Sequence, residues 1–420
     1  MKVFCTPNVA LNEKSSRQIN TIGVNLFQQN SEHTAGLGSR LIPAVKKWHY
    51  QPTQTAWDFL SISLAVIAAD TFVKRDAAAE GWTREIELIV AVYDPTPWQK
   101  TIESLEQTLR FLSGDQWRIS IIGEGEPVPT VKKPQLITED CACLFSGGLD
   151  SLIGSIDLIS SGKSPALVSH AYPKDREKQV ALASKVIPAN LSHFIENIHP
   201  RWNGDNETSM RARSMLFLGM GILVASGLDA NNRTLYIPEN GFISLNIPLT
   251  TRRIASLSTK TTHPFFISSL QRIIEEAGIP VSIQNPYGFK TKGEMLAECS
   301  DQNILIAEGA RSVSCGKWKR KNCQCGKCIP CIIRRAAYKA AGIEDQTKYL
   351  HPDLRRTQAY SVHSELDDLK SVQFAIAKSR EANIKRMVLR SAPLRFSEVI
   401  QNSYVDVFKR GLEEIDNFIP

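Results

Sequence analysis

The sequence lacks an apolar run that we would expect to cross a bilayer. Its longest apolar stretches, at residues 59–73 and 216–228, are short for that purpose and are interrupted by small or polar residues. The first residues carry no apolar stretch typical of a secretory signal. The sequence also does not have the composition of a disordered chain, because 42% of the residues are hydrophobic and only 22% are charged. We therefore expect a folded, soluble, cytoplasmic protein without a membrane partner.

The chain is long for one domain and changes character along its length. Its 420 residues can form two or three domains. Residues 1–135 combine helical spacing, as at 57–73, with strand-like runs, as at 85–93, and they predict an accessory α+β domain. We assign the catalytic domain to residues 136–345 and a helical C-terminal extension to residues 346–420.

Strands and helices alternate from residue 141 onward. An apolar strand at 141–145 precedes a helix at 151–159, and a strand at 166–170 precedes a helix at 177–187. This alternation predicts an α/β fold, with a parallel sheet covered by helices on both faces. In such folds, ligands bind at the carboxyl ends of the strands.

A glycine-rich loop joins the first of these strands to its helix. Its six residues are Ser146, Gly147, Gly148, Leu149, Asp150 and Ser151. The two glycines permit backbone torsions that turn N–H groups toward an anion, and the following helix adds its positive N-terminal end. The loop lacks the Gly-Lys-Ser/Thr ending of a Walker motif and does not match the dinucleotide fingerprint. It predicts a phosphate site of a different type.

Five of the nine cysteines lie between residues 315 and 331. In a chain expected in the cytoplasm, such clustering is typical of metal binding rather than of disulfides. Cys315, Cys325, Cys328 and Cys331 predict a structural Zn²⁺ site, since four thiolates leave no open coordination position. Two alternatives stay open: Cys323 could replace one of the four ligands, and an iron–sulfur cluster could take the place of zinc.

The loop resembles the Ser-Gly-Gly-x-Asp-Ser signature of pyrophosphate-loop enzymes of the adenine nucleotide alpha hydrolase-like fold. Together with the cysteines it resembles the 7-cyano-7-deazaguanine synthase family, QueC. Further matches are Lys292 with Glu294, and Ser314 before Cys315. The family's Arg-Asn pair is matched only by Arg213 and Ser214, and the resemblance covers about residues 140–340.

The resemblance implies a ligase that uses ATP, Mg²⁺ and Zn²⁺. It implies that the carboxylate of 7-carboxy-7-deazaguanine is adenylated, that ammonia displaces AMP to give an amide, and that a second ATP yields a nitrile. Asp150 is then expected near the pyrophosphate and its magnesium, Lys292 at the carboxylate or phosphate, and Arg213 at the nucleotide. Glu239 replaces the aspartate of the family's base pocket and is expected to accept hydrogen bonds from a guanine-type edge.

The chain departs from the family in its length and in this pocket, where the residues after Pro238 are Glu239 and Asn240. It is similar to QueC-like proteins with extra domains in bacterial antiviral defence, in particular to QatC of the Qat system. This similarity implies that the deazaguanine is passed to the amine of a partner protein. It leaves open whether the protein forms a homo-oligomer, and we do not expect nucleic acid to be the direct substrate.

Two other functions stay open from the sequence. A tRNA sulfur-transfer enzyme would use the same loop, and Cys141 and Cys143 would then be candidate sulfur carriers. A non-catalytic subunit would bind ATP and dock effector proteins without cleaving the nucleotide.

Overall fold

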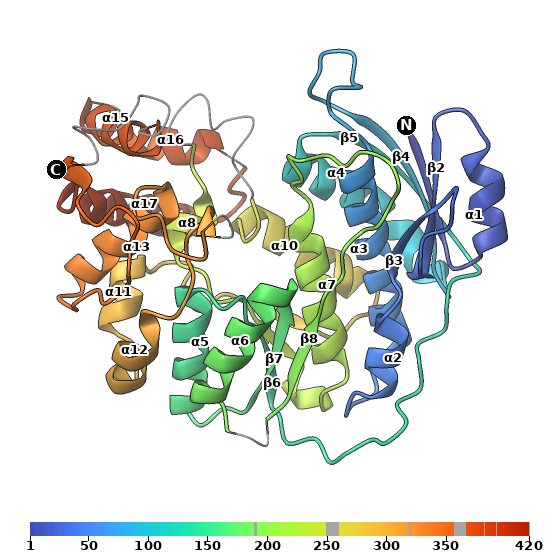
Figure 1. Cartoon of the computed structure of the whole chain (residues 1–420), viewed down its shortest axis with the longest axis horizontal. Coiled ribbons are helices and arrows are strands. Elements are labelled where there is room, and N and C mark those ends of the chain that lie inside the picture. The colour runs from blue at the N-terminus through green and yellow to red at the C-terminus, as the bar shows by residue number, and fades with distance from the viewer. Residues whose placement is uncertain are drawn as a thin grey trace.

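The computed structural model describes residues 1–188, 191–248, 260–318, 321–356, 367–381, 383–391 and 393–419. Two five-stranded sheets organise this part of the chain, one built from the N-terminal residues and one from the residues that follow the linker (Figure 1). Every strand pairing within the two sheets is parallel.

The N-terminal sheet has the strand order β3-β2-β1-β4-β5. In chain order its strands are β1 (Lys2–Thr6), β2 (Thr21–Gln28), β3 (Ala35–Gly38), β4 (Glu85–Ala91) and β5 (Gln116–Ile122). Its connections contain α1 (Val9–Ser16), α2 (Leu41–Lys46), α3 (Gln54–Phe72), η1 (Thr96–Thr101) and α4 (Ile102–Ser113). The predicted α+β class is wrong for this region, which is α/β. Helices α1, α3 and α4 lie in the connections β1–β2, β3–β4 and β4–β5, as crossovers between parallel strands do, whereas the described residues between β2 and β3 contain no helix.

The second sheet has the strand order β10-β9-β6-β7-β8, which confirms the predicted parallel sheet. Its strands are β6 (Cys141–Leu144), β7 (Pro165–His170), β8 (His193–Glu196), β9 (Thr234–Tyr236) and β10 (Ser282–Gln284). Its connections contain α5 (Leu149–Ser160), α6 (Pro173–Val186), α7 (Arg213–Ser226), η2 (Ala230–Asn232), α8 (Gly241–Leu245) and α10 (Pro264–Glu276).

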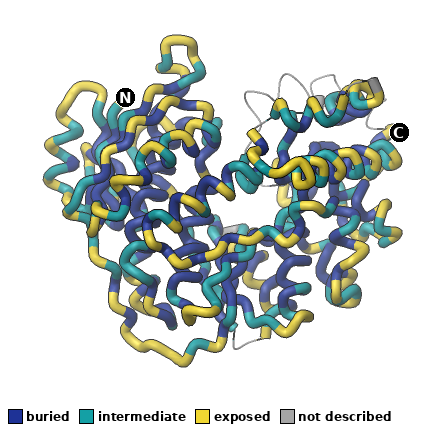
Figure 2. The backbone as a smooth tube through the Cα atoms, turned by 180° about the vertical axis from the view of Figure 1, so that it is seen from behind, coloured by how far each residue is buried: buried dark blue, intermediate teal, exposed yellow. Residues whose placement is uncertain are grey.

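The two sheets share one apolar core. Helix α3 packs along α7, and α4 packs along α10, so two helical layers lie between the sheets. Buried residues of both sheets, including Val24, Leu88, Ala142 and Leu235, belong to one continuous cluster. Figure 2 shows this as a buried band between the two halves. The N-terminal region is therefore built into the second sheet's core.

Helix α3 is the one described helix that is long and apolar enough to cross a membrane by length and composition. This differs from the expectation that the run is too short. Its most apolar 18-residue window is 94% buried inside the protein, which is the pattern of a core helix.

The remaining helices complete the side of the second sheet that faces away from the N-terminal sheet. They are α11 (Lys292–Ala297), α12 (Gln302–Gly309), α13 (Ile329–Ala340), α15 (Asp367–Glu381), α16 (Ile384–Ser391) and α17 (Glu398–Asp416). Helix α17 packs against α8, α11, α13, α15 and α16 and forms a separate apolar core with several of them. The C-terminal residues thereby lie against the segment that carries Lys292.

Candidate functional site

The phosphate loop lies at the carboxyl end of β6, where the strand meets α5. Gly147 has φ +76°, and a Cβ built there would lie 3.0 Å from Cγ of Gln179, so both torsion and space favour glycine. The Ser146 and Ser151 hydroxyl oxygens lie 3.2 Å apart, and the Gly148 amide donates to Ser146 Oγ at 3.2 Å. The loop is therefore folded around its own two hydroxyl groups.

Two further contacts fix this loop in the protein. Gln179 of α6 donates from Nε2 to the Ser146 carbonyl at 3.0 Å. The amide of Val313 donates to the Gly147 carbonyl at 3.0 Å. Val313 lies two residues before Cys315, so the cysteine cluster and the phosphate loop are joined through a very short segment.

A cavity of about 430 Å³ opens in front of the loop. Ser146, Gly147, Ser151, Arg213 and Glu239 all line it, so five of the predicted residues converge on one space. Its apolar and aromatic walls include Phe217, Met220, Ile237, Pro238 and Trp318. Such a mixture of apolar surface and a few convergent polar groups is typical of a small-molecule site.

Arg213 is held at one side of this cavity. It is the first residue of α7 and donates to the Tyr172 hydroxyl at 2.8 Å. Its guanidinium also lies over the Tyr172 ring, with 6.0 Å between Cζ and the ring centroid. This arrangement directs a permanent positive charge at the cavity.

Asp150 and Lys292 form a buried ion pair next to the cavity, and neither lines it. The second Asp150 oxygen accepts from the Asn240 side chain at 2.7 Å and from its backbone amide at 3.2 Å. Burial alone would raise the pKa of Asp150, but Lys292 and the hydrogen-bond donors outweigh it, and the pKa is lowered. The Asp150 carboxylate is therefore ionised and fully engaged.

Glu239 is the second carboxyl group of this cluster. Burial and the neighbouring Asp150 charge raise its pKa well above the ordinary value. The Glu239 carboxyl lies close enough to Asp150 and Lys292 for their charges to act on its pKa, with Asp150 raising it and Lys292 lowering it. At the cavity wall, the surroundings of Glu239 therefore disfavour its charged form.

The start of α11 positions Lys292. Thr291 and Glu294 form a reciprocal capping box, with the Thr291 amide donating to Glu294 Oε2 at 2.8 Å. Helix α17 supports this turn: Glu414 accepts from the Thr291 hydroxyl, and Arg410 contacts Glu294 Oε1 at 2.6 Å. The C-terminal helix thus holds the turn that carries the lysine.

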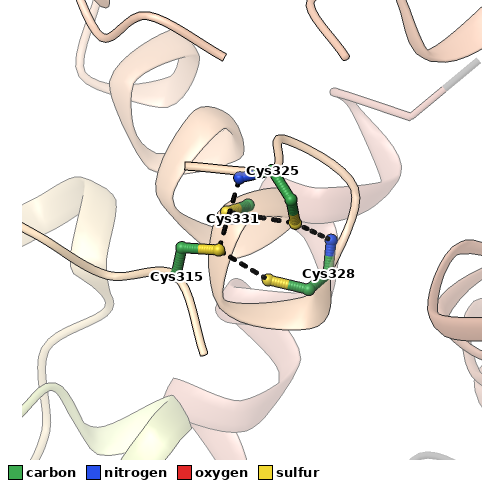
Figure 3. Close-up of side chains that lie close together, drawn as sticks. All are labelled: Cys315, Cys325, Cys328 and Cys331. Carbon is green, nitrogen blue, oxygen red and sulfur yellow. Dashed lines mark hydrogen bonds between the residues drawn. The ribbon is translucent and has the colours of Figure 1, made fainter. Parts of the chain in front are cut away.

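Four thiols meet at the predicted metal site (Figure 3). All Sγ atoms of Cys315, Cys325, Cys328 and Cys331 lie within 4.8 Å of one another. Two pairs, Cys325–Cys331 and Cys315–Cys328, have Sγ atoms 3.9 Å apart. A tetrahedron with Zn–S bonds of about 2.3 Å has S···S edges of about 3.8 Å. The four residues therefore fit a tetrahedral ion such as zinc.

Cys323 is not part of this cluster. Its thiol contacts the carbonyl oxygens of Gln324 and Lys348, at 3.6 and 3.5 Å. The alternative that Cys323 replaces one of the four ligands is therefore disfavoured. The backbone supports the four instead, because the amides of Cys325 and Lys317 point at Cys315 Sγ, at 3.3 and 3.4 Å.

The proposed sulfur carriers are core residues. Cys141 and Cys143 are both fully buried in β6, and Cys143 has a pKa raised to about 12 by burial. Neither thiol lines the cavity.

Sequence reasoning missed several residues of the site. Gln179, Tyr172 and Trp318 gave no signal, because each reaches the loop or cavity only through the tertiary fold. Asn240 precedes a glycine at a turn, which was visible, but its pairing with Asp150 spans 90 residues of sequence.

Residues 261–342 match the family model described as queuosine biosynthesis protein QueC. Curated relatives named 7-cyano-7-deazaguanine synthase align with about half of the chain and nearly their whole length. The Methanoregula boonei protein is 23% identical over 228 residues, covering 49% of this chain and 97% of its own. The Pseudomonas putida protein is 26% identical over 235 residues, covering 49% and 96%. These matches confirm the resemblance to QueC that the motifs indicated.

Proposed function

We propose that this QueC-like chain is an ATP-dependent enzyme that adenylates the carboxylate of 7-carboxy-7-deazaguanine. The observation that carries the proposal is the convergence of the phosphate loop, Arg213 and Glu239 on one cavity beside a four-cysteine cluster. In the first step, a carboxylate oxygen attacks the α-phosphorus of ATP. The bond to the β-phosphate breaks, and pyrophosphate leaves.

The residues of the cavity suit the charges of this step. The loop amides, the two serine hydroxyls and Arg213 offer donors to developing negative charge on phosphate oxygens. Because the surroundings of Glu239 disfavour its charged form, it contributes little negative charge to repel the nucleotide, and its carboxyl oxygen can accept hydrogen bonds from a guanine-type edge. The apolar walls exclude water from an acyl-adenylate that water would hydrolyse.

We assign Asp150 and Lys292 to holding the site rather than to direct contact with magnesium. Both oxygens of Asp150 are engaged by Lys292 and Asn240. Mg²⁺ would then arrive with the nucleotide phosphates, whose charge it neutralises. Zinc bound by the four thiols would have a structural role and would fix Val313, which donates to the phosphate loop.

The acyl carbon of the adenylate is next attacked by an amine nitrogen, and AMP leaves. With ammonia, the product is the amide, and a second adenylation followed by loss of AMP gives the nitrile. With the amine of a partner protein, the product is a protein adduct. We propose the protein acceptor and a role in antiviral defence on the resemblance to QatC and on the two added helices, α3 and α17, that pack against α7 and α11.

The test is incubation of the purified protein with MgATP, ammonium and 7-carboxy-7-deazaguanine. We expect AMP and pyrophosphate in amounts that depend on the deazaguanine, with amide or nitrile detected by mass spectrometry. Guanine, which lacks the carboxylate, is the matched control. AMP formation that is equal with guanine, or absent with both compounds, would contradict the proposal.

The acceptor is tested by adding each protein encoded beside this chain. A deazaguanine mass adduct that requires ATP supports transfer to a protein. Nitrile formed at the same rate with and without these proteins would favour ammonia.

A second candidate is a nucleotide-sensing subunit. The observation that favours it is the closed Asp150–Lys292 pair, which does not reach the cavity wall. Tight binding of ATP with no AMP produced under any of the conditions above would support this alternative.

A further inference from the structure

Helix α7 forms one wall of the nucleotide cavity. Arg213, Phe217 and Met220 line the cavity and follow the i, i+4, i+7 spacing of a single helix face. Another face of the helix packs against α3 of the N-terminal region. A Cβ built at Gly219 would lie 2.8 Å from Ser63 Oγ, so the two helices approach very closely there.

Asp70 of α3 holds the backbone immediately before the first turn of α7. The N-cap residue of α7 is Ala212, which has no side chain able to accept a hydrogen bond. Asp70 Oδ2 accepts from the backbone amides of Arg211 and Ala212, both at 2.7 Å. A carboxylate at this place satisfies two buried backbone amides at the entrance to the helix and is favoured by the helix dipole. Arg213 is the next residue.

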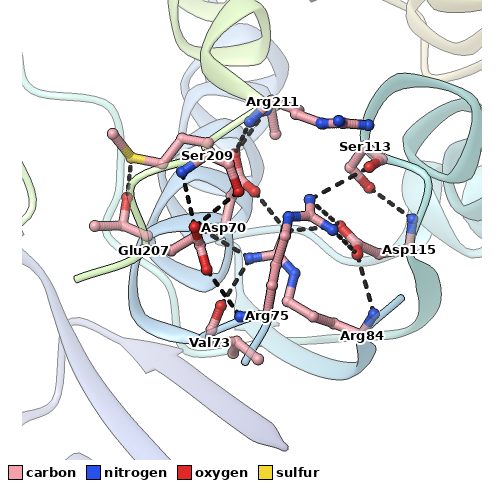
Figure 4. A network of polar contacts seen from close by, with 12 residues as sticks. Asp70, Val73, Arg75, Arg84, Ser113, Asp115, Glu207, Ser209 and Arg211 are labelled. Atoms are coloured by element: carbon pink, nitrogen blue, oxygen red, sulfur yellow. Dashed lines mark hydrogen bonds and ion pairs between the residues drawn. The ribbon is translucent and has the colours of Figure 1, made fainter. Parts of the chain in front are cut away.

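A buried network fixes Asp70 in turn (Figure 4). Arg84 bridges Asp70 and Asp115, at 2.6 Å to each, and Arg75 contacts Asp115 at 2.7 Å. Glu207 accepts from the Arg75 amide at 2.8 Å and so joins the chain leading into α7 to the same network. All of these groups are buried. Any movement that separates two members leaves a buried charge without its partner, which is costly. We therefore expect the network to hold Asp70 in one position.

We infer that Asp70 is a positioning residue of the proposed reaction: it holds the start of α7 so that Arg213 faces the nucleotide. The inference rests on the proposed function and extends it, because it makes the N-terminal sheet a part of the nucleotide site's support. Asp70 itself does not line the cavity and acts only through α7.

The test compares Asp70→Asn with Asp58→Asn. Asp58 is the matched control because it is also a buried aspartate of α3, yet it accepts from Tyr93 and Asp94 of the N-terminal region. We expect Asp70→Asn to weaken ATP binding about 10-fold in calorimetry, and Asp58→Asn to change it less than about 2-fold. If Asp70→Asn does not fold, Asp70→Glu, which keeps the charge, takes its place.

Two measurements separate positioning from a general loss of stability. In a chain that already carries Arg213→Ala, Asp70→Asn should weaken ATP binding no further, since Asp70 acts through Arg213. Hydrogen exchange at residues 211–213 should accelerate in Asp70→Asn and stay unchanged in Asp58→Asn. Equal exchange in the two variants, or additive losses of affinity, would overturn the inference. Failure of the unsubstituted protein to bind ATP would overturn the proposed function, while the exchange data would still decide the role of Asp70.

Discussion

Two carboxyl groups and one lysine share a buried space beside the phosphate loop. Burial acts on both groups, but Lys292 and Asn240 outweigh it at Asp150 and lower the pKa of that group, whereas burial and the Asp150 charge raise the pKa of Glu239. The state of this cluster depends on pH.

We predict that Glu239 makes the protein less stable as pH rises. Its pKa is raised in the folded state, so its stabilising effect is complete below the unfolded value near 4.5 and is lost as pH rises through the folded value. Between these values the folded state binds the extra proton, and stability falls by about 1.4 kcal/mol per pH unit. Glu239→Gln should remove this slope in urea unfolding measured in magnesium-free buffer. An unchanged slope in the variant would contradict the assignment.

Local sequence revealed the loop and the thiols, because each motif is compact in sequence. The pairing of Asp150 with Lys292 spans 142 residues, and only the fold could disclose it. The parallel pairing of strands in the N-terminal region was also not predicted. The run at 85–93 predicted β4, whereas β1 to β3 were not recognised, so the crossovers that involve them were not apparent.

At the scale of elements, the four-cysteine segment leads into α13, because Cys328 is its N-cap residue. We predict one zinc per chain by elemental analysis, with Cys328→Ser losing the metal and lowering the unfolding temperature. Cys323→Ser is the control, since Cys323 lies outside the cluster. Metal loss that is equal in both variants would show that the ligand set is wrong.

Helix α17 supports the start of α11 through Glu414. We predict that Glu414→Gln lowers the free energy of unfolding by about 1 kcal/mol, because the Thr291 hydroxyl and the Gly293 amide donate to different carboxylate oxygens and glutamine replaces one of these with an NH2 group. Glu413→Gln, one residue earlier and exposed, should change it by less than about 0.5 kcal/mol. Urea unfolding of the two variants measures these changes. Equal losses of unfolding free energy in both would contradict the supporting role of α17.

At the scale of the whole molecule, the contact between α3 and α7 joins the two sheets. We predict that Gly219→Ala destabilises the protein, since overpacking costs about 1–3 kcal/mol and the helical gain from alanine offsets only about 1 kcal/mol. Ser63→Gly should restore much of the loss, because Ser63 supplies the nearest atoms. Gly123→Ala, in open space, is the control. Additive effects of Ser63→Gly and Gly219→Ala in urea unfolding would contradict this close contact.

The contact between Asp70 and Arg211 also has a consequence for folding during synthesis. The two residues are 141 positions apart, so α3 leaves the ribosome long before α7 exists. At roughly 5–20 residues per second, the delay is about 7–28 s. During that time the face of α3 that later packs along α7 has no partner there, and the Asp70 carboxylate can pair with Arg84 but not yet with the Arg211 amide.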